Sequence, residues 1–194
     1  MQSHYVIVEP CFGCPFRVEG IRFVPHHSYD DGLTLLFFHA NGLHKETFTV
    51  LITRLLEIIS PVKIHDIWAI GSAGEYAIAA YAFLSTTSHG ADFHRRELIG
   101  IAHSAGATGL LMLQNAHPEI PFRGLILMDP GILPPGRSSS SKLAGIFHEI
   151  ALSKPDTWTS VEEARRDLSR TYRGFAPATL EEFLVRHLPN QYTK

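Results

Sequence analysis

The sequence has few cysteines, no surplus of basic residues and no long hydrophobic run. Each of these absences excludes a class of protein. Only Cys11 and Cys14 occur in 194 residues, which excludes a scaffold held by several disulfides. Lys and Arg number 17 against 19 Asp and Glu, so the net charge of −2 provides no basic surface for a nucleic-acid backbone. No apolar run reaches the about 18 residues that a membrane-spanning helix needs, and segment 1–10 lacks the Lys or Arg of a secretory signal. We therefore expect a cytoplasmic protein with no membrane span and no nucleic-acid partner.

The composition that remains is typical of a globular chain with a substantial core. Hydrophobic residues make up 45% of the chain and charged residues 19%. A chain of this length buries about 70% of its surface on folding. The serine run Ser138 to Ser141 follows a Pro-Pro-Gly-Arg segment, a pattern typical of a junction. We expect an α/β core over 1–135 and a helical cap or lid over 136–194.

Strand and helix patterns alternate through the first part of the chain. Apolar runs predict strands at 5–8, 17–24, 33–38, 63–70, 98–102 and 125–128. Apolar residues at helical spacing predict helices at 48–59, 76–84 and 105–116. Strands separated by helices indicate an α/β fold with a doubly wound, mostly parallel sheet of six strands.

The second part of the chain has no strand pattern and predicts about three helices. Two segments, Ser160 to Glu163 and Thr179 to Glu182, have the Ser/Thr-x-x-Glu spacing of a capping box. We therefore expect helices that begin at Ser160 and Thr179.

The Cys11-Phe-Gly-Cys14 segment has the spacing of half a zinc site. No second cysteine pair completes it, so a tight hairpin between the first two strands is the favoured interpretation. We expect no metal and no cofactor.

A strand, a turn of small residues and a helix follow one another around Ser104, in the segment Ile99-Gly-Ile-Ala-His-Ser-Ala-Gly106. This resembles the G-x-S-x-G turn that exposes a nucleophilic serine, with Ala102 in place of the first glycine. The Ala105 N–H would lie at a helix N-terminus, where it can donate to a developing oxyanion. The alternative is that Ser104 only caps the helix.

A second motif, His39-Ala-Asn-Gly42, directly follows the strand predicted at 33–38. In acyl-transfer enzymes a loop at this place supplies the second N–H of the oxyanion hole. The alternative is an ordinary strand-to-helix loop that uses Gly42 for its turn.

These motifs resemble the α/β-hydrolase superfamily, and more narrowly the fungal α/β-hydrolase-1-type proteins. The similar segments are 35–46, 99–106, 124–130 and 158–188. The resemblance implies that Ser104 is the nucleophile and that the N–H groups of Ala105 and Asn41 form the oxyanion hole. The residues beside these motifs are expected to contact substrate: His39, Ala40 and His103.

Asp129 ends the strand that follows the Ser104 helix, and it is the candidate acid. Neighbouring parallel strands lie about 4.8 Å apart, so its carboxylate can approach the site. Some members of the superfamily place their acid after this strand and others after the next. The alternative for Asp129-Pro130 is a turn that ends the strand.

The sequence departs from the family in two places. The family has an additional loop after the strand that corresponds to 63–70, whereas here the strand leads directly into Gly71. The family also continues past its cap into two more strands and a catalytic histidine. None of the twelve histidines follows Asp129 at a strand end, because His148 and His187 fall on expected cap helices.

Two functions are therefore open. One is a serine hydrolase that cleaves an ester, amide or lactone of a small apolar acyl substrate. The alternative is a shortened, catalytically impaired homologue that acts only as a ligand-binding or interaction protein. In the shortened homologue, the strand at 125–128 would be an unpaired edge, which favours self-association.

Overall fold

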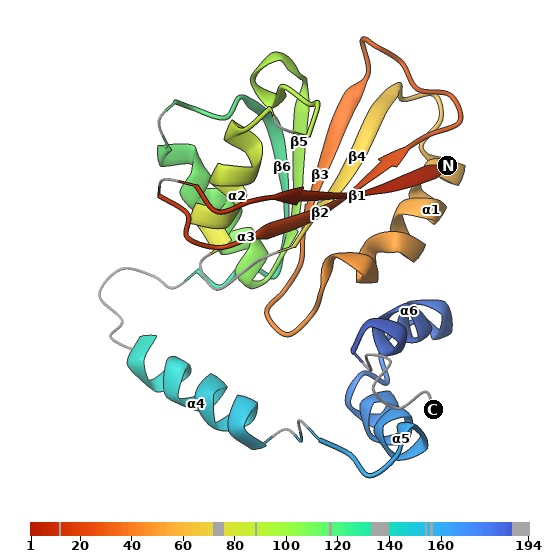
Figure 1. Cartoon of the computed structure of the whole chain (residues 1–194), viewed down its shortest axis with the longest axis vertical. Coiled ribbons are helices and arrows are strands. Elements are labelled where there is room, and N and C mark those ends of the chain that lie inside the picture. The colour runs from red at the N-terminus through yellow and green to blue at the C-terminus, as the bar shows by residue number, and fades with distance from the viewer. Residues whose placement is uncertain are drawn as a thin grey trace. The chain divides into compact units, whose positions relative to one another are not determined.

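The computed structural model of the chain describes residues 1–194 with the exception of Phe12, 72–75, Ser88, His117, 133–139, Lys154, Asp156 and 188–194. The chain divides into two compact units, Met1–Gly131 and Ile132–Lys194, both drawn in Figure 1. The boundary expected between residues 135 and 136 lies outside the described residues. The described residues contain no helix that is long and apolar enough to cross a membrane.

The first unit contains a six-stranded sheet with the order β1-β2-β4-β3-β5-β6 (Figure 1). The strands β3 to β6 run parallel, whereas β1 pairs antiparallel with β2 and β2 pairs antiparallel with β4. The strands are β1 (Gln2–Val8), β2 (Val18–Val24), β3 (Leu33–Phe38), β4 (Ile64–Ile70), β5 (Leu98–His103) and β6 (Phe122–Met128). The expected α/β fold with a mostly parallel sheet is confirmed. Both β1 and β6 begin earlier than their apolar runs, because backbone pairing with β2 and β5 continues beyond them.

Both faces of the central strands are buried, as the apolar run in β3 predicted. Leu36 and Phe38 point into one core cluster, whereas Leu35 and Phe37 point into another. Successive side chains of a strand point to opposite faces, so the alternation places one cluster on each side of the sheet. This explains why β3 contains no polar face.

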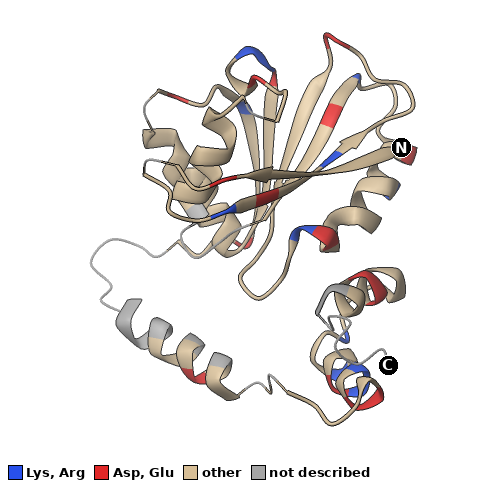
Figure 2. Cartoon of the chain, viewed as in Figure 1, with Lys and Arg blue, Asp and Glu red and all other residues tan. Residues whose placement is uncertain are grey.

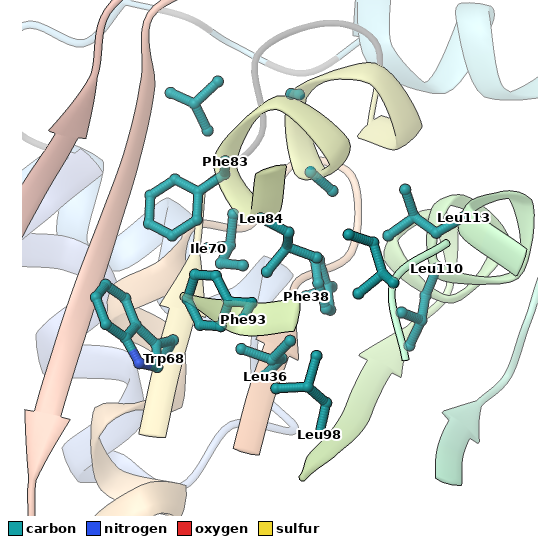
Figure 3. Close-up of a cluster of buried hydrophobic side chains, with 14 of the residues drawn as sticks. Leu36, Phe38, Trp68, Ile70, Phe83, Leu84, Phe93, Leu98, Leu110 and Leu113 are labelled. Atoms are coloured by element: carbon teal, nitrogen blue, oxygen red, sulfur yellow. The ribbon is translucent and has the colours of Figure 1, made fainter. Parts of the chain in front are cut away.

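Helices cover the two faces of the sheet and complete the two clusters. The helices α2 (Tyr76–Ser85) and α3 (Ala105–Met112) contribute Phe83 and Leu110 to the cluster drawn in Figure 3. On the other face, α1 (Thr49–Ile58) contributes Ile52. The part of this unit that the structure describes also contains three short 3₁₀ turns: η1 (Lys45–Phe48), η2 (Phe93–Arg95) and η3 (Leu113–Asn115). The sheet is therefore doubly wound, as expected.

A buried charge network joins four segments near the start of the parallel strands. Asp66 on β4 has no exposed surface, and its two carboxylate oxygens each lie 2.7 Å from Arg96 Nη1. Arg22 Nε donates to Asp66 Oδ2 at 2.8 Å, and Thr34 Oγ1 donates to Oδ1 at 2.8 Å. Burial opposes ionisation of Asp66, but the hydrogen bond and charge of Arg96 outweigh it and lower the pKa of the carboxyl.

The connection between β1 and β2 is the tight hairpin expected from the Cys-x-x-Cys segment. Cys11 N donates to Cys14 O and Cys14 N donates to Cys11 O, each at 2.9 Å. Gly13 has a φ of +87°, a backbone conformation that favours glycine. Both cysteines are free thiols.

The described residues of the second unit form three helices, α4 (Ser140–Ser153), α5 (Val161–Thr171) and α6 (Pro177–His187). Ser160 caps α5 as expected, because its side chain accepts a hydrogen bond from Glu163 N at 3.1 Å. The start expected for the last helix at Thr179 is wrong. This helix begins at Pro177, since Leu180 N already donates to Ala176 O, and proline is favoured in a first helical turn.

Aromatic and charged contacts join α5 to α6. The rings of Tyr172 and Phe183 lie 4.4 Å apart between centroids. Arg165 Nη1 and Glu181 Oε1 form an ion pair between the two helices. Figure 2 shows charged residues on α5 and α6, whereas the sequences of α2 and α3 contain none.

Candidate active site

Ser104 occupies a strained turn between β5 and α3. Its φ and ψ are 51° and −117°, a conformation that residues with a Cβ rarely adopt. Its side chain makes no capping hydrogen bond to α3, so the interpretation of Ser104 as a side-chain cap is not supported. Its backbone instead holds the turn in place, because Ser104 N donates to Met128 O at 2.9 Å. Ser104 is half-buried, and no capping hydrogen bond ties its side chain to the helix.

Glycine at position 106 brings this turn against the end of β3. A Cβ on Gly106 would lie 2.6 Å from His39 O and 2.7 Å from Phe38 O. A contact this short with backbone atoms cannot be accommodated without a shift of the chain. The small-residue pattern after Ser104 therefore reflects close packing, and it places the Ser104 turn beside the His39–Gly42 loop.

The loop after β3 contains the second candidate segment. Leu43 N donates to Ala40 O at 3.1 Å, and Gly42 has a φ of +76°. Ala40 is buried, whereas Asn41 and Gly42 are exposed at the tip of the turn. The turn geometry expected for Gly42 is present, and both Asn41 and Gly42 can be reached from outside.

His39 is buried and has a defined role in this loop. Only 5% of its surface is exposed, and its Nδ1–H donates to Ala40 O at 2.9 Å. Burial lowers the pKa of His39 and favours the neutral ring. His39 therefore supports the loop backbone from within, close to the Ser104 turn.

A cluster of charged side chains anchors the same loop, and the sequence analysis missed it. Lys45 Nζ lies 3.1 Å from Glu19 Oε2 and 3.2 Å from Glu46 Oε1, and His44 Nδ1 lies 3.3 Å from Glu46 Oε2. Burial opposes ionisation of Glu46, but the hydrogen bond from His44 and the charge of Lys45 lower its pKa to about 2. The only signal in the sequence was the charged run 44–46, whose partner Glu19 lies on another strand.

A small polar cavity of about 230 Å³ opens beside this cluster. The lining residues are Arg17, Glu19, His39, Leu43, His44, Lys45 and Gly71. Its position next to the loop after β3 makes it a candidate subsite for a polar group. Among the described residues, no group of three or more His, Cys, Asp or Glu is arranged to hold a metal ion.

Asp129 follows β6 and lies one strand away from Ser104. Its φ is 47°, so the chain bends sharply at Asp129 directly after β6. The hydrogen bond from Ser104 N to Met128 O places Asp129 one residue beyond the contact between the two strand ends. Asp129 is exposed, which is compatible both with an acid at the edge of a site and with a strand-ending turn.

Two other histidines, His65 and His89, donate to backbone carbonyls outside the Ser104 turn. His65 Nδ1–H donates to Tyr29 O at 3.0 Å, and His89 Nε2–H donates to Phe83 O at 2.9 Å. His103, the last residue of β5, is half-buried and pairs in register with Met128. His148 is exposed on α4, in the second unit. The structure therefore brings Ser104, Asp129 and the loop after β3 together, but the described contacts assign no histidine to Ser104.

Curated relatives from Penicillium species are similar to this chain, whereas no family model matches it. The type I acyl-CoA thioesterase mpaH of Penicillium brevicompactum is 29% identical over 176 residues, which are 81% of this chain and 40% of the relative. The protein of the same name from Penicillium roqueforti is 28% identical over 180 residues, 82% of this chain and 41% of the relative. The chain therefore spans about two fifths of the length of these relatives.

Solved structures resemble the chain in fold at low sequence identity. The peroxisomal α/β-hydrolase Lpx1 of Saccharomyces cerevisiae matches 94% of this chain and 60% of its own, with a TM-score of 0.69 and 16% identity. A thioesterase domain from the curacin biosynthetic pathway matches 98% of this chain and 70% of its own, with a TM-score of 0.60 and 13% identity. Likeness at these identities shows the fold. By the order of its strands, the strained turn at Ser104 and these similarities, the chain has the α/β-hydrolase fold.

Proposed function

We propose that this chain carries the nucleophile of a serine hydrolase that cleaves an acyl thioester or ester. The observation that carries the proposal is the φ of 51° at Ser104, in a turn between strand and helix whose Gly106 packs against the end of β3. A serine held in a strained turn of this kind projects its hydroxyl at the edge of the sheet. The names of the curated relatives point to thioesters, and the proposed acyl group is small and apolar.

In the proposed mechanism, Ser104 Oγ attacks the acyl carbonyl and forms a tetrahedral intermediate. The intermediate's oxyanion accepts hydrogen bonds from the N–H groups of Ala105 and Asn41. Ala105 is the first residue of α3, whose N-terminus favours negative charge. Amide donors fixed before the reaction stabilise the charge as it develops, which is the largest contribution to many acyl transfers. Substrate contacts are assigned to the residues around these donors: His39, Ala40 and His103.

Asp129 is the proposed acid of this site. An acid of this kind accepts a hydrogen bond from a histidine and stabilises the imidazolium that forms when the serine loses its proton. The hydrogen bond from Ser104 N to Met128 O supports the assignment, because it keeps the two strand ends in register. Residues 136–194 are proposed to act as a helical cap that contributes to substrate selection.

The proposal is tested by labelling the full chain with a fluorophosphonate, which reacts with activated serines. We expect one label per chain, and we expect Ser104→Ala to abolish it. Ser153→Ala is the matched control, because Ser153 is an exposed serine at the end of α4. Labelling that persists in Ser104→Ala would show that another residue is the nucleophile.

A second function is favoured by one observation, namely that the rings of His65 and His89 donate to the backbone carbonyls of Tyr29 and Phe83. Without a general base, a serine hydroxyl is a weak nucleophile. In that case the chain binds acyl ligands or a protein partner without turnover. Titration with a non-hydrolysable acyl thioether distinguishes the two functions, since binding without fluorophosphonate labelling supports the second and contradicts the first.

A further inference from the structure

We infer that Cys11 and Cys14 form a reversible disulfide by exchange with a small disulfide such as oxidised glutathione. The inference is independent of the proposed hydrolase function, because neither cysteine belongs to the Ser104 site. It accounts for the Cys-x-x-Cys segment, which the hairpin alone does not require.

The backbone brings the two cysteines within disulfide range. Each donates its N–H to the carbonyl of the other at 2.9 Å, so they form a hydrogen-bonded antiparallel pair. The Cα atoms of such a pair lie about 5.5 Å apart. Disulfides span Cα separations of roughly 4.4–6.8 Å. The side chains of a directly opposed pair extend to the same face, so closing the bond requires side-chain rotation and no rearrangement of the hairpin.

The two thiols differ in exposure, so we expect them to act in different steps of the exchange. Cys11 is exposed, whereas Cys14 is only 1% exposed and its Sγ lies 3.6 Å from Phe16 O. The Cys11 thiolate attacks one sulfur of the small disulfide and releases one thiol. The Cys14 thiolate then attacks the Cys11 sulfur of the mixed disulfide and releases the second thiol. The two cysteines together lose two hydrogens, and the small disulfide is reduced to two thiols.

Both cysteines line an apolar groove of about 560 Å³ between the hairpin and the helices α2 and α3. Figure 1 shows the turn between β1 and β2 beside these helices, and Figure 2 shows that they carry no charged residue. The groove leaves space for the Cys14 sulfur to reach Cys11. The other lining residues are Gly13, Ala77, Ile78, Tyr81, Ala82, Ser85, Thr86, Met112, Leu113 and Ala116. Oxidation replaces the exposed thiol at the rim of the groove with a closed ring and restrains the hairpin.

The test is incubation of the full chain with oxidised glutathione, followed by intact-mass measurement and peptide mapping. We expect a loss of about 2 Da, protection of both cysteines from alkylation, and full reversal by dithiothreitol. A chain that stays reduced, stops at a single glutathione adduct or forms mainly disulfide-linked dimers would overturn the inference.

Two single variants separate the steps. Cys14→Ser should stop at a glutathione adduct on Cys11, because no second thiol resolves it. Cys11→Ser should form its adduct more slowly, on the order of tenfold, because the remaining thiol is buried. Equal rates in the two variants would refute the assignment of Cys11 as the first thiol.

Phenylarsine oxide provides a test on the unmodified chain that does not depend on how the variants fold. Its arsenic binds two neighbouring thiols and releases one water. We expect one arsenical per chain with the loss of both free thiols. If the chain binds no arsenical, or binds two arsenicals that are both removed by mild washing, the two thiols are not close together.

Discussion

At the scale of single residues, Glu46 shows how the loop beside Ser104 is held. Its carboxylate is buried next to Lys45 and His44, and its pKa is lowered to about 2. A buried charge is tolerated only when its partners compensate for the lost water. Glu46 therefore stabilises the loop only while it is ionised.

This predicts a defined dependence of stability on pH. The pKa of about 2 in the folded chain lies below the ordinary value of 4.5, so the stabilisation is complete above pH 4.5 and is lost as the pH falls toward 2. We expect Glu46→Gln to reduce the free energy of unfolding at neutral pH by about 1–3 kcal/mol and to flatten this pH dependence. Urea unfolding at a series of pH values measures both effects.

The control for this prediction is Glu162→Gln, which changes an exposed carboxyl group in the first turn of α5. It should leave the acid limb of the stability profile as in the unmodified chain. If the unmodified chain and Glu46→Gln lose stability equally as the pH falls, the role given to Glu46 is contradicted.

At the scale of elements, local sequence patterns predicted the structural features that depend on residues adjacent in the sequence. The apolar run at 33–38 predicted a strand buried on both faces, and the small residues around Ser104 predicted a sharp turn. Contacts between distant segments were missed. Asp66 meets arginines from two other segments, and Lys45 meets Glu19 across 26 residues of sequence. No periodicity in one segment indicates which distant charge it will contact, so these networks required the structure.

The two expected helix caps illustrate the same limit in one element. Ser160 and Thr179 have identical spacing to a glutamate three residues later, but only Ser160 caps its helix. The chain before Thr179 is already helical, since α6 begins at Pro177. A capping motif therefore marks a helix start only where the preceding residues leave the helix.

We expect Ser160→Ala to destabilise α5 by about 0.5–2 kcal/mol, because the N–H of Glu163 loses its acceptor. Hydrogen exchange of the amides in the first turn of α5 measures the loss directly. Thr179→Ala is the matched control and should change exchange in α6 little. Equal acceleration of exchange in both variants would argue against Ser160 as the functional cap.

At the scale of the whole molecule, the outer edge of the sheet bears on whether copies of the chain associate. Among the described strands, β6 is the last of the sheet and pairs only with β5. Ile126 on this strand is 53% exposed. Exposed backbone and apolar side chains at a sheet edge favour pairing with another chain. We propose that copies of this chain associate through β6.

The association is tested by sedimentation at increasing protein concentration. We expect a growing fraction of dimers or larger species, and we expect Ile126→Lys to reduce it, because a charge on an edge strand opposes pairing. Ile58→Lys changes an isoleucine that is 77% exposed at the end of α1 and serves as the control. The proposal is contradicted if the chain is a monomer at all concentrations, or if both variants reduce the fraction of larger species equally.

The network around Asp66 and the candidate site lie at different ends of the parallel strands. It aligns β2, β3, β4 and the segment before β5 near the starts of the parallel strands, whereas Ser104 and Asp129 lie beyond the ends of β5 and β6. The loops after β3, β5 and β6 supply none of the four residues of this network. Substitutions in those loops can therefore alter the candidate site without removing the contacts that align the strands.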